Sequence, residues 1–178
     1  SVKQPSSFTR LANLVSSTGK KITTDTIIDY LNYLEDTWIL FPLENYVSKL
    51  ADKVSNKKFY FMDNGILSLF LMDPETSLLE NLVAVTLKKR YGDGLYFYHR
   101  NIEVDFYLDE AHKAIQVSYS LKDPETRKRE VNALLKLAEN VAVDDLCIIT
   151  RDEEEMIVEG EKTIRVVPVW RWLLDDEE

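Results

Sequence analysis

The sequence predicts an α/β protein with a mixed β-sheet, organised in two consecutive parts. In the first part, two helices with apolar residues at every third or fourth position precede two β-prone segments. In the second part, the order of helical and β-prone segments is α-β-β-β-α-β-β. The segment 145–150 is a continuous apolar run, which is typical of a buried strand with a parallel neighbour. These observations favour a sheet with both parallel and antiparallel pairs.

The first part, residues 1–76, has the element order of a winged-helix unit: helix, helix, strand, loop, strand. The second helix is expected to begin after Thr23, a good capping residue. Strands are expected at 37–47 and 58–63, and a turn at 63–65 precedes a short apolar helix. The predicted apolar face of the second helix consists of Ile27, Tyr30, Leu31 and Leu34. We therefore expect a winged-helix-like domain at 1–76.

The second part is expected at residues 77–178. Asp73-Pro74 marks the boundary before it, because a residue that precedes proline is disfavoured in a helix. A helix is expected at 78–91, ended by Gly92, and a second helix at 125–141. The expected strands are 95–100, 102–109, 113–120 and 145–150, and a last strand with a terminal turn spans 163–174. The strand at 102–109 alternates, which predicts one face formed by Ile102, Val104, Phe106 and Leu108.

The strands 102–109 and 113–120 are expected to form a hairpin that carries polar side chains. If residues 109–112 are the loop, the register places Asp105 opposite Gln116. Directly opposed residues share a face of the sheet, and Ser118 lies on that face two positions further along. Glu80 interrupts an apolar row on the preceding helix, and a carboxylate in such a row requires a partner. The four side chains are therefore expected to converge on one side of the sheet.

Several phrases of the sequence resemble known families. LLENLVAVTLKK, RNIEVDFYL and AIQVSYS, followed by a helix and a strand, resemble the PD-(D/E)XK superfamily, which has the restriction-endonuclease-like fold. The whole chain more closely resembles the C-terminal region of prokaryotic AAA+ ATPases of unknown function, in which a winged-helix part precedes a nuclease-like domain. DYLNYLEDTWILFPLENY and KKFYFMDNGIL are similar to that winged-helix part.

The resemblance implies nuclease positions in the second part. The helix glutamate of the superfamily falls on Glu80, its metal-binding aspartate on Asp105, and its (D/E)XK triplet on Gln116-Val117-Ser118. The candidate metal ligands are therefore Glu80 and Asp105. The triplet departs from the pattern, because Gln116 brings no charge and Ser118 supplies no cation. Since Mg²⁺ prefers anionic oxygen ligands, we expect the four positions to be vestigial and the nuclease chemistry to be lost.

Two alternatives remain open for this site. A lysine from elsewhere, such as Lys113 or Lys122, would replace the missing cation, and the site would then be an active Mg²⁺-dependent deoxyribonuclease. Alternatively, Glu80 and Asp105 are structural and hydrogen-bond to neighbours such as Tyr98, Tyr107 or Ser118. No cofactor is expected in this fragment, and Mg²⁺ is expected only if the nuclease is active.

The charge and the missing motifs limit the function. The chain has 22 Lys+Arg against 31 Asp+Glu, and the predicted second helix carries acids and no basic residue, which disfavours phosphate contacts. The sequence has no G-x-x-x-x-G-K-[ST] loop, so the resemblance implies an ATPase module upstream in the same chain. No run approaches the ~20 apolar residues of a membrane span, and the single cysteine, Cys147, suits a reducing cytoplasm.

The leading expectation is a non-motor region of a cytoplasmic AAA+ ATPase with a degenerate nuclease-like domain. Its role would be recognition or scaffolding, with nucleic acid as a candidate ligand. The second hypothesis is the active deoxyribonuclease described above. The third is a protein–protein interaction module without nucleic-acid contact, which the acidic net charge of −9 favours.

Overall fold

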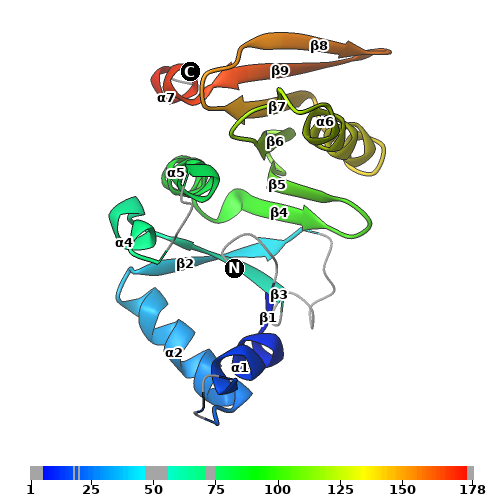
Figure 1. Cartoon of the computed structure of the whole chain (residues 1–178). Coiled ribbons are helices and arrows are strands. Elements are labelled where there is room, and N and C mark those ends of the chain that lie inside the picture. Colours follow the sequence, from blue (N-terminus) through cyan, green and yellow to red (C-terminus); the bar gives the residue numbers. More distant parts are fainter. Residues whose placement is uncertain (1–5, 18, 20, 47–55, 71–74, 176–178) are drawn as a thin grey trace.

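The computed structural model describes residues 6–17, 19, 21–46, 56–70 and 75–175. Within these residues the protein is an α/β protein with one mixed sheet, in the strand order β1-β3-β2-β4-β5-β6-β7-β9-β8 (Figure 1). The strands are β1 (Ser6–Ser7), β2 (Leu40–Asn45), β3 (Asn56–Phe61), β4 (Leu95–His99), β5 (Glu103–Leu108), β6 (Lys113–Val117), β7 (Asp145–Thr150), β8 (Glu155–Glu159) and β9 (Lys162–Pro168). The helices are α1 (Phe8–Ser16), α2 (Thr24–Asp36), α4 (Asn64–Ser68), α5 (Glu75–Tyr91), α6 (Pro124–Ala138) and α7 (Val169–Leu174), with a 3₁₀ turn at Gly92–Gly94.

The helices of the first part begin where the capping residues predict. The side chain of Thr23 accepts a hydrogen bond from the backbone N–H of Thr26 at the start of α2, and Asp63 caps α4 in the same way. The predicted apolar face of α2 is only partly covered, because Ile27 is buried while Tyr30 is 53% exposed. The predicted boundary at Asp73-Pro74 lies outside the described residues.

The sheet continues from the first part into the second. Strand β2 pairs antiparallel with β3 and parallel with β4, so the strands of residues 40–61 belong to the same sheet as those of 95–168. The side chain of Asn81 on α5 accepts a hydrogen bond from the N–H of Phe61 at 2.9 Å and donates one to its C=O at 2.8 Å. The two parts predicted from the sequence are thus joined by backbone pairing and by a side-chain bridge.

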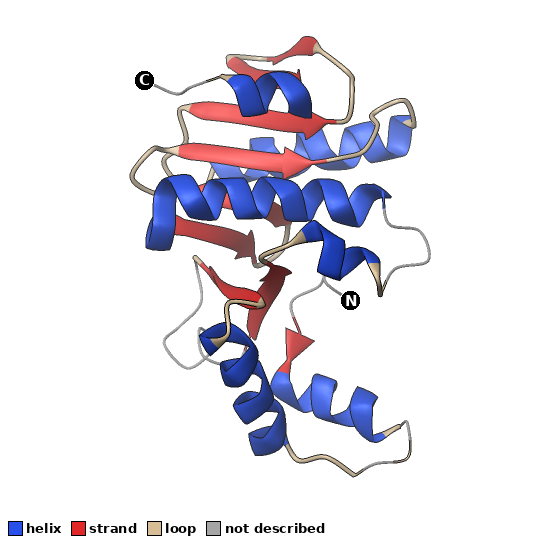
Figure 2. Ribbon diagram, turned by 90° about the vertical axis from the view of Figure 1, so that its left-hand side faces the viewer, coloured by secondary structure: helices blue, strands red, loops and turns tan. Residues whose placement is uncertain are grey.

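Helices cover both faces of the sheet (Figure 2). Helices α5 and α7 lie on one face, over a core cluster that contains Phe41, Tyr60, Val83, Phe106 and Trp172. Helix α6 lies on the other face, over a second cluster that contains Val104, Tyr107, Leu134, Ile148 and Ile164. Helices α1 and α2 lie beyond the β2–β3 end of the molecule (Figures 1 and 2). In the described part of the chain, no helix combines the length and apolarity needed to cross a membrane.

The register of the central hairpin is the predicted one, but its alternation is not. Leu108 pairs with Lys113 and Phe106 with Ile115, as a loop at 109–112 requires. Between the pairs Tyr96↔Tyr107 and Tyr98↔Val104, however, β4 advances two residues and β5 advances three. This irregularity is a β-bulge, which reverses the alternation of the strand. Val104 therefore lies on the α6 face, and the prediction that it shares a face with Phe106 is wrong.

The C-terminal end differs from the prediction in two places. Residues 155–159, for which no strand was predicted, form the edge strand β8, which pairs antiparallel with β9 through a turn at Gly160. The predicted terminal turn is the helix α7, in which Trp172 is buried while Trp170 is 55% exposed. The apolar segment 145–150 is confirmed as a buried strand, and it is parallel to both β6 and β9.

Candidate functional site

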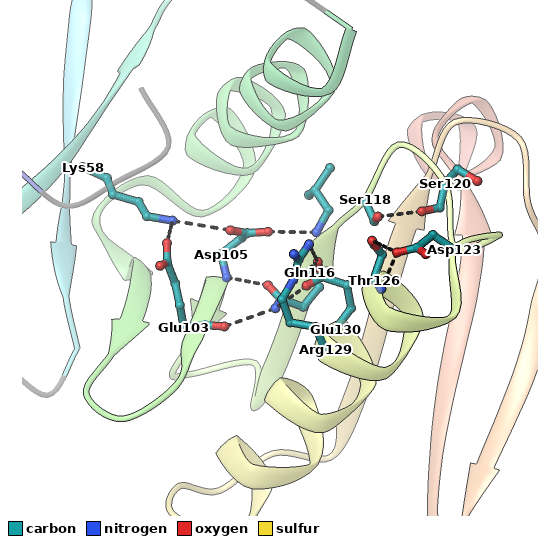
Figure 3. Close-up of polar contacts among 11 residues, drawn as sticks. Lys58, Glu103, Asp105, Gln116, Ser118, Ser120, Asp123, Thr126, Arg129 and Glu130 are labelled. Atoms are coloured by element: carbon teal, nitrogen blue, oxygen red, sulfur yellow. Dashed lines mark hydrogen bonds and ion pairs between the residues drawn. The ribbon is translucent and has the colours of Figure 1, made fainter. Parts of the chain in front are cut away.

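The four candidate residues line one pocket of about 580 Å³ between α5, α6 and the central hairpin. Glu80 lies on α5, Asp105 on β5 and Gln116 on β6. Ser118 follows directly after Val117, the last residue of β6. Other lining residues are Thr76, Asn101, Ile102, Glu103, Val117, Arg129, Glu130, Asn132, Ala133 and Lys136. Asp105, Gln116 and Ser118 lie close together beside the irregular part of β5 (Figure 3).

Asp105 lies beside the bulge, where side chains replace backbone pairing. Its N–H donates to the side-chain oxygen Oε1 of Gln116 at 2.8 Å, and its own Oδ2 accepts from the N–H of Val117 at 3.0 Å. Buried backbone N–H groups need acceptors, and these two bonds provide them where the ladder between β5 and β6 ends. The prediction that Asp105 and Gln116 are neighbours is correct, and the contact between them runs from backbone to side chain.

Lys58 on β3 provides the cation of this site, which the sequence analysis missed. Its ammonium Nζ lies 2.7 Å from Oε1 of Glu103 and 3.4 Å from Oδ1 of Asp105, and its side chain is 0% exposed. The ammonium also lies 5.5 Å from the ring centre of Phe97, so Lys58 extends across β4 to reach the hairpin. Lys58 and Tyr60 are two positions apart on one predicted strand, so they share a face of it, and this spacing could have indicated a buried polar pair. The sequence analysis did not place that strand near this pocket.

The lysines considered from the sequence are not the cation of the site. Lys113 forms an ion pair with Asp145, with 3.3 Å between Nζ and Oδ2, and Lys122 is an exposed loop residue that does not line the pocket. Lys58 lies on β3, which is separated from β5 by β2 and β4, and its long side chain reaches Asp105 because β2 joins β3 to the rest of the sheet through its pairing with β4. Local sequence cannot report that contact, since 47 positions separate Lys58 from Asp105.

The electrostatics of the site favour a charged lysine. Burial alone would lower the pKa of the Lys58 ammonium, because the low-dielectric interior disfavours the charged form. The carboxylates of Asp105, Glu80 and Glu103 outweigh burial and raise this pKa above its ordinary value. Lys58 is therefore a fixed cation at neutral pH, and it lacks the neutral amine that a nucleophile or general base requires.

Glu80 is held by a tyrosine from β3. The phenol of Tyr60 donates to Oε1 of Glu80 at 3.0 Å, and both side chains are buried. Burial first, and then the nearby carboxylate of Glu80, raise the pKa of Tyr60 well above its ordinary value, so the phenol remains a donor. The expectation that Glu80 and Asp105 have hydrogen-bond partners is correct. The structure pairs Glu80 with Tyr60, and Asp105 with Lys58 and Val117, in place of the predicted Tyr98, Tyr107 and Ser118.

Gln116 connects the hairpin to α6. Its amide nitrogen Nε2 donates to Oε2 of Glu130 at 2.8 Å and to the C=O of Glu103 at 3.2 Å. The other carboxylate oxygen of Glu130, Oε1, accepts a hydrogen bond from Nη2 of Arg129 at 2.6 Å. Burial raises the pKa of Glu130, and the bonds to Arg129 only partly oppose that shift. Both the oxygen and the nitrogen of the Gln116 side-chain amide are thus hydrogen-bonded within the protein.

Ser118 lines the pocket, but its hydroxyl points into the following loop (Figure 3). Its Oγ donates to the C=O of Ser120 at 3.0 Å, and its N–H donates to Ile149 on β7 at 3.0 Å. These contacts tie the end of β6 to the loop that leads into α6. The hydroxyl therefore serves the local backbone in this arrangement.

The donor atoms of this pocket do not fit a Mg²⁺ site. The oxygens of Asp105 accept bonds from Lys58 and Val117, and Oε1 of Gln116 accepts one from Asp105. A hard cation would have to displace the buried ammonium of Lys58, which already balances the carboxylates. Among the residues with a described position, no group of three or more His, Cys, Asp and Glu side chains is arranged to hold a metal ion.

Comparison with known proteins gives two matches. Residues 1–77 match the family described as "Domain of unknown function (DUF8612)". The chain is 32% identical to the "Uncharacterized protein MJ1544" of Methanocaldococcus jannaschii, and the alignment covers 94% of this chain and 40% of that protein. The chain thus spans less than half the length of the relative it matches. No solved structure matches. The chain therefore contains a DUF8612 domain in its first part and is a distant homologue of the uncharacterized protein MJ1544.

Proposed function

We propose that this chain is a recognition or scaffolding module with a degenerate nuclease-like core. Its first part would be winged-helix-like, its second part restriction-endonuclease-like, with the boundary at residues 76–77. In this proposal the chain is the non-motor region of a cytoplasmic AAA+-type ATPase, and it works with an ATPase module of the same protein. The observation that carries the proposal is the occupation of the four nuclease positions by internal contacts.

The topology of the second part supports the nuclease-like assignment. Strands β4, β5 and β6 form an antiparallel meander, α6 crosses over, and β7 lies parallel to β6. Because α5 precedes β4 along the chain, the second part has the α-β-β-β-α-β order expected for the PD-(D/E)XK superfamily. Glu80, Asp105 and the triplet at 116–118 line one pocket of this core, as the resemblance requires.

The chemistry of the pocket supports loss of catalysis. A nuclease of this kind needs carboxylate oxygens for a metal ion and a cation near the attacked phosphate. Here the ammonium of Lys58 lies between the carboxylates of Glu103 and Asp105, where it neutralises them. The glutamine and serine of the triplet join the same hydrogen-bond network. In this proposal the polar groups of the pocket have a structural role, because their hydrogen bonds connect α5 and α6 to the rest of the sheet.

The length of the relative supports a multi-domain protein. The aligned region is 40% of MJ1544, which leaves room in a protein of that kind for a further module. The chain itself carries no phosphate-binding loop, so ATP hydrolysis would belong to such a module.

Calorimetric titration with Mn²⁺ and cleavage assays on duplex DNA test the loss of catalysis. We expect no heat of binding and no cleavage for the wild type. The double variant Gln116→Glu/Ser118→Lys restores the triplet, and it should gain Mn²⁺ affinity if the nuclease geometry has persisted. Gln116→Glu alone is the control. A double variant that binds no Mn²⁺ would count against the nuclease-like assignment.

Lys58 also favours a second candidate, the active Mg²⁺-dependent deoxyribonuclease. The altered triplet has Ser118 where the superfamily has a lysine. Lys58, beside Asp105 at the metal-binding position, is a lysine that could take that role. Metal-dependent cleavage by the wild type that is lost in both Asp105→Ala and Lys58→Met, while each variant keeps the circular dichroism spectrum of the folded protein, would establish this candidate and overturn the leading proposal.

Fluorescence anisotropy decides between nucleic acid and protein as the recognised ligand. Labelled duplex, single-stranded and branched DNA are titrated at two salt concentrations, because phosphate contacts weaken as salt rises. Salt-sensitive binding would support nucleic-acid recognition. Absence of binding at low salt would assign the module to protein scaffolding.

A further inference from the structure

A second groove, of about 710 Å³, lies at the end of α2 and over the start of β2 and β4. It shares no residue with the pocket around Asp105. Its floor is apolar, and its rim carries both aromatic and charged side chains. The lining residues are Glu35, Asp36, Trp38, Leu40, Phe41, Pro42, Glu44, Lys57, Met62, Lys88, Asp93, Leu95 and Tyr96.

Trp38 stands at the rim of this groove in a strained backbone conformation. Helix α2 ends in a Schellman motif, in which Trp38 N–H donates to Glu35 C=O at 2.9 Å and Ile39 N–H donates to Leu34 C=O at 2.9 Å. Trp38 therefore occupies the left-handed position that glycine usually fills, with φ of 58°. Its side chain is 76% exposed, so the strain is not offset by burial within this chain.

The charge around the groove is negative. Four carboxylates line it against two lysines. Both lysines already have acidic partners, since Lys57 lies 3.9 Å from Glu44 and Lys88 lies 2.8 Å from Asp93. Glu35 and Asp36 add two negative charges beside the exposed indole. This balance repels nucleic-acid phosphates and attracts cationic groups.

We propose that this groove binds a polypeptide segment of a partner protein in which a basic side chain adjoins an apolar one. The basic side chain would contact Glu35 and Asp36 and the face of the Trp38 indole, which attracts cations. The apolar side chain would cover the floor formed by Leu40, Pro42 and Leu95. Tryptophan is one of the residue types enriched among the few positions that carry most of the binding free energy of an interface. The groove shares no residue with the nuclease-like pocket, so peptide binding here does not depend on the fate of that pocket.

The test uses the whole chain and a fluorescein-labelled twelve-residue peptide of alternating arginine and leucine, followed by anisotropy. Two variants address the groove: Trp38→Ala and Glu35→Gln/Asp36→Asn. Two matched controls lie elsewhere: Trp170→Ala removes another exposed tryptophan, and Glu159→Gln/Glu161→Gln removes the same charge from the exposed β8–β9 turn. A peptide with glutamate in place of arginine and a duplex DNA serve as alternative ligands.

We expect both groove variants to weaken peptide binding about tenfold or more, and both controls to change it less than about twofold. Trp38→Gly should lose binding to the same degree while its melting temperature is kept or raised, because glycine removes the backbone strain. The proposal is overturned if the wild type does not bind the arginine–leucine peptide, if the controls weaken binding as much as the groove variants do, or if duplex DNA binds in a Trp38-dependent way.

Discussion

At the scale of single residues, the central feature is a buried cation surrounded by carboxylates. Lys58 and Tyr60, two positions apart on β3, satisfy Asp105 and Glu80 respectively. Such a cluster contributes little net stability as a whole, because desolvation opposes the attraction between its charges. Each member is nevertheless required once the others are buried, since removing one partner leaves uncompensated charge.

Replacing Lys58 with methionine should destabilise the fold strongly. Methionine keeps much of the volume but leaves Glu103 and Asp105 without their cation, a loss of about 3–5 kcal/mol for a buried pair. Urea unfolding followed by circular dichroism measures the change in free energy of unfolding. The control is Lys57→Met, whose surface pair with Glu44 should contribute less than about 1 kcal/mol. Equal effects from the two substitutions would contradict the buried cluster.

The pH dependence of stability should report on Glu130. Because burial raises its pKa in the folded state, the folded protein binds more protons than the unfolded chain between the ordinary and the raised value. This stabilising contribution is complete below the ordinary glutamate pKa of about 4.3, and it is lost as pH rises through the raised value.

Glu130→Gln removes that titration. Relative to wild type, this variant should become more stable, with a larger free energy of unfolding, as pH rises through that window. Urea unfolding at a series of pH values from about 4 upward provides the measurement. Glu139→Gln, at an exposed position just after α6, should retain the wild-type slope. A parallel pair of curves for wild type and Glu130→Gln would refute the assignment.

At the scale of elements, the β-bulge in β5 determines where the polar groups of the site lie. The extra residue reverses the strand's alternation, so Val104 packs under α6 while Phe106 packs under α5. Asp105 stands at the reversal, and Gln116 supplies the acceptor that the interrupted ladder lacks. Bulges are frequent beside functional sites because they redirect single side chains.

The β8–β9 hairpin depends on Gly160, whose φ is 61°. Only glycine adopts this left-handed conformation without steric cost, so Gly160→Ala should destabilise the protein by about 1 kcal/mol. For a chain of this size that corresponds to a decrease of about 2–4 °C in melting temperature, measured by calorimetry. Gly94→Ala is the matched control, because no positive φ is recorded there and an added Cβ meets nothing within 4 Å. A larger loss for Gly94→Ala would contradict this reasoning.

At the scale of the whole molecule, the two parts predicted from the sequence share one sheet and one core. The cluster under α5 contains Phe41 and Tyr60 from the first part together with Val83 and Phe106 from the second. The DUF8612 match ends at residue 77, next to the predicted boundary at 76, so sequence families and packing describe different units. The division into two domains stays a prediction.

We expect a single cooperative unfolding transition for the chain. Strand β2 pairs with β4, so unfolding the first part would expose the face of the second part that α5 covers. It would also leave the carboxylates of Glu103 and Asp105 without the cation of Lys58. Differential scanning calorimetry should give equal calorimetric and van 't Hoff enthalpies. Two resolved transitions would instead indicate two independently stable units.

Local sequence patterns were enough to predict the α/β class, most element positions and the register of the central hairpin. These follow from local periodicity, capping residues and loop length, all of which act over a few positions. The same register predicted that Asp105 and Gln116 are neighbours, and all four candidate residues line one pocket. They do not share one side of the sheet, because Glu80 lies on α5 and Gln116 bonds to Glu130 on α6, which covers the other face. Strand β8 was missed because acidic residues surround a single buried position, Ile157, and give little alternation.

Long-range packing sets which cation serves the pocket and which partners its polar groups bond to. Lys58 reaches Asp105 because β2 pairs with β4, a long-range contact that no local pattern encodes. The bulge in β5 is likewise a feature of its pairing with β4, a separate strand. Burial then decided the chemistry, because carboxylates removed from water take the nearest available donors. In this protein those donors are a lysine, a tyrosine and a backbone N–H.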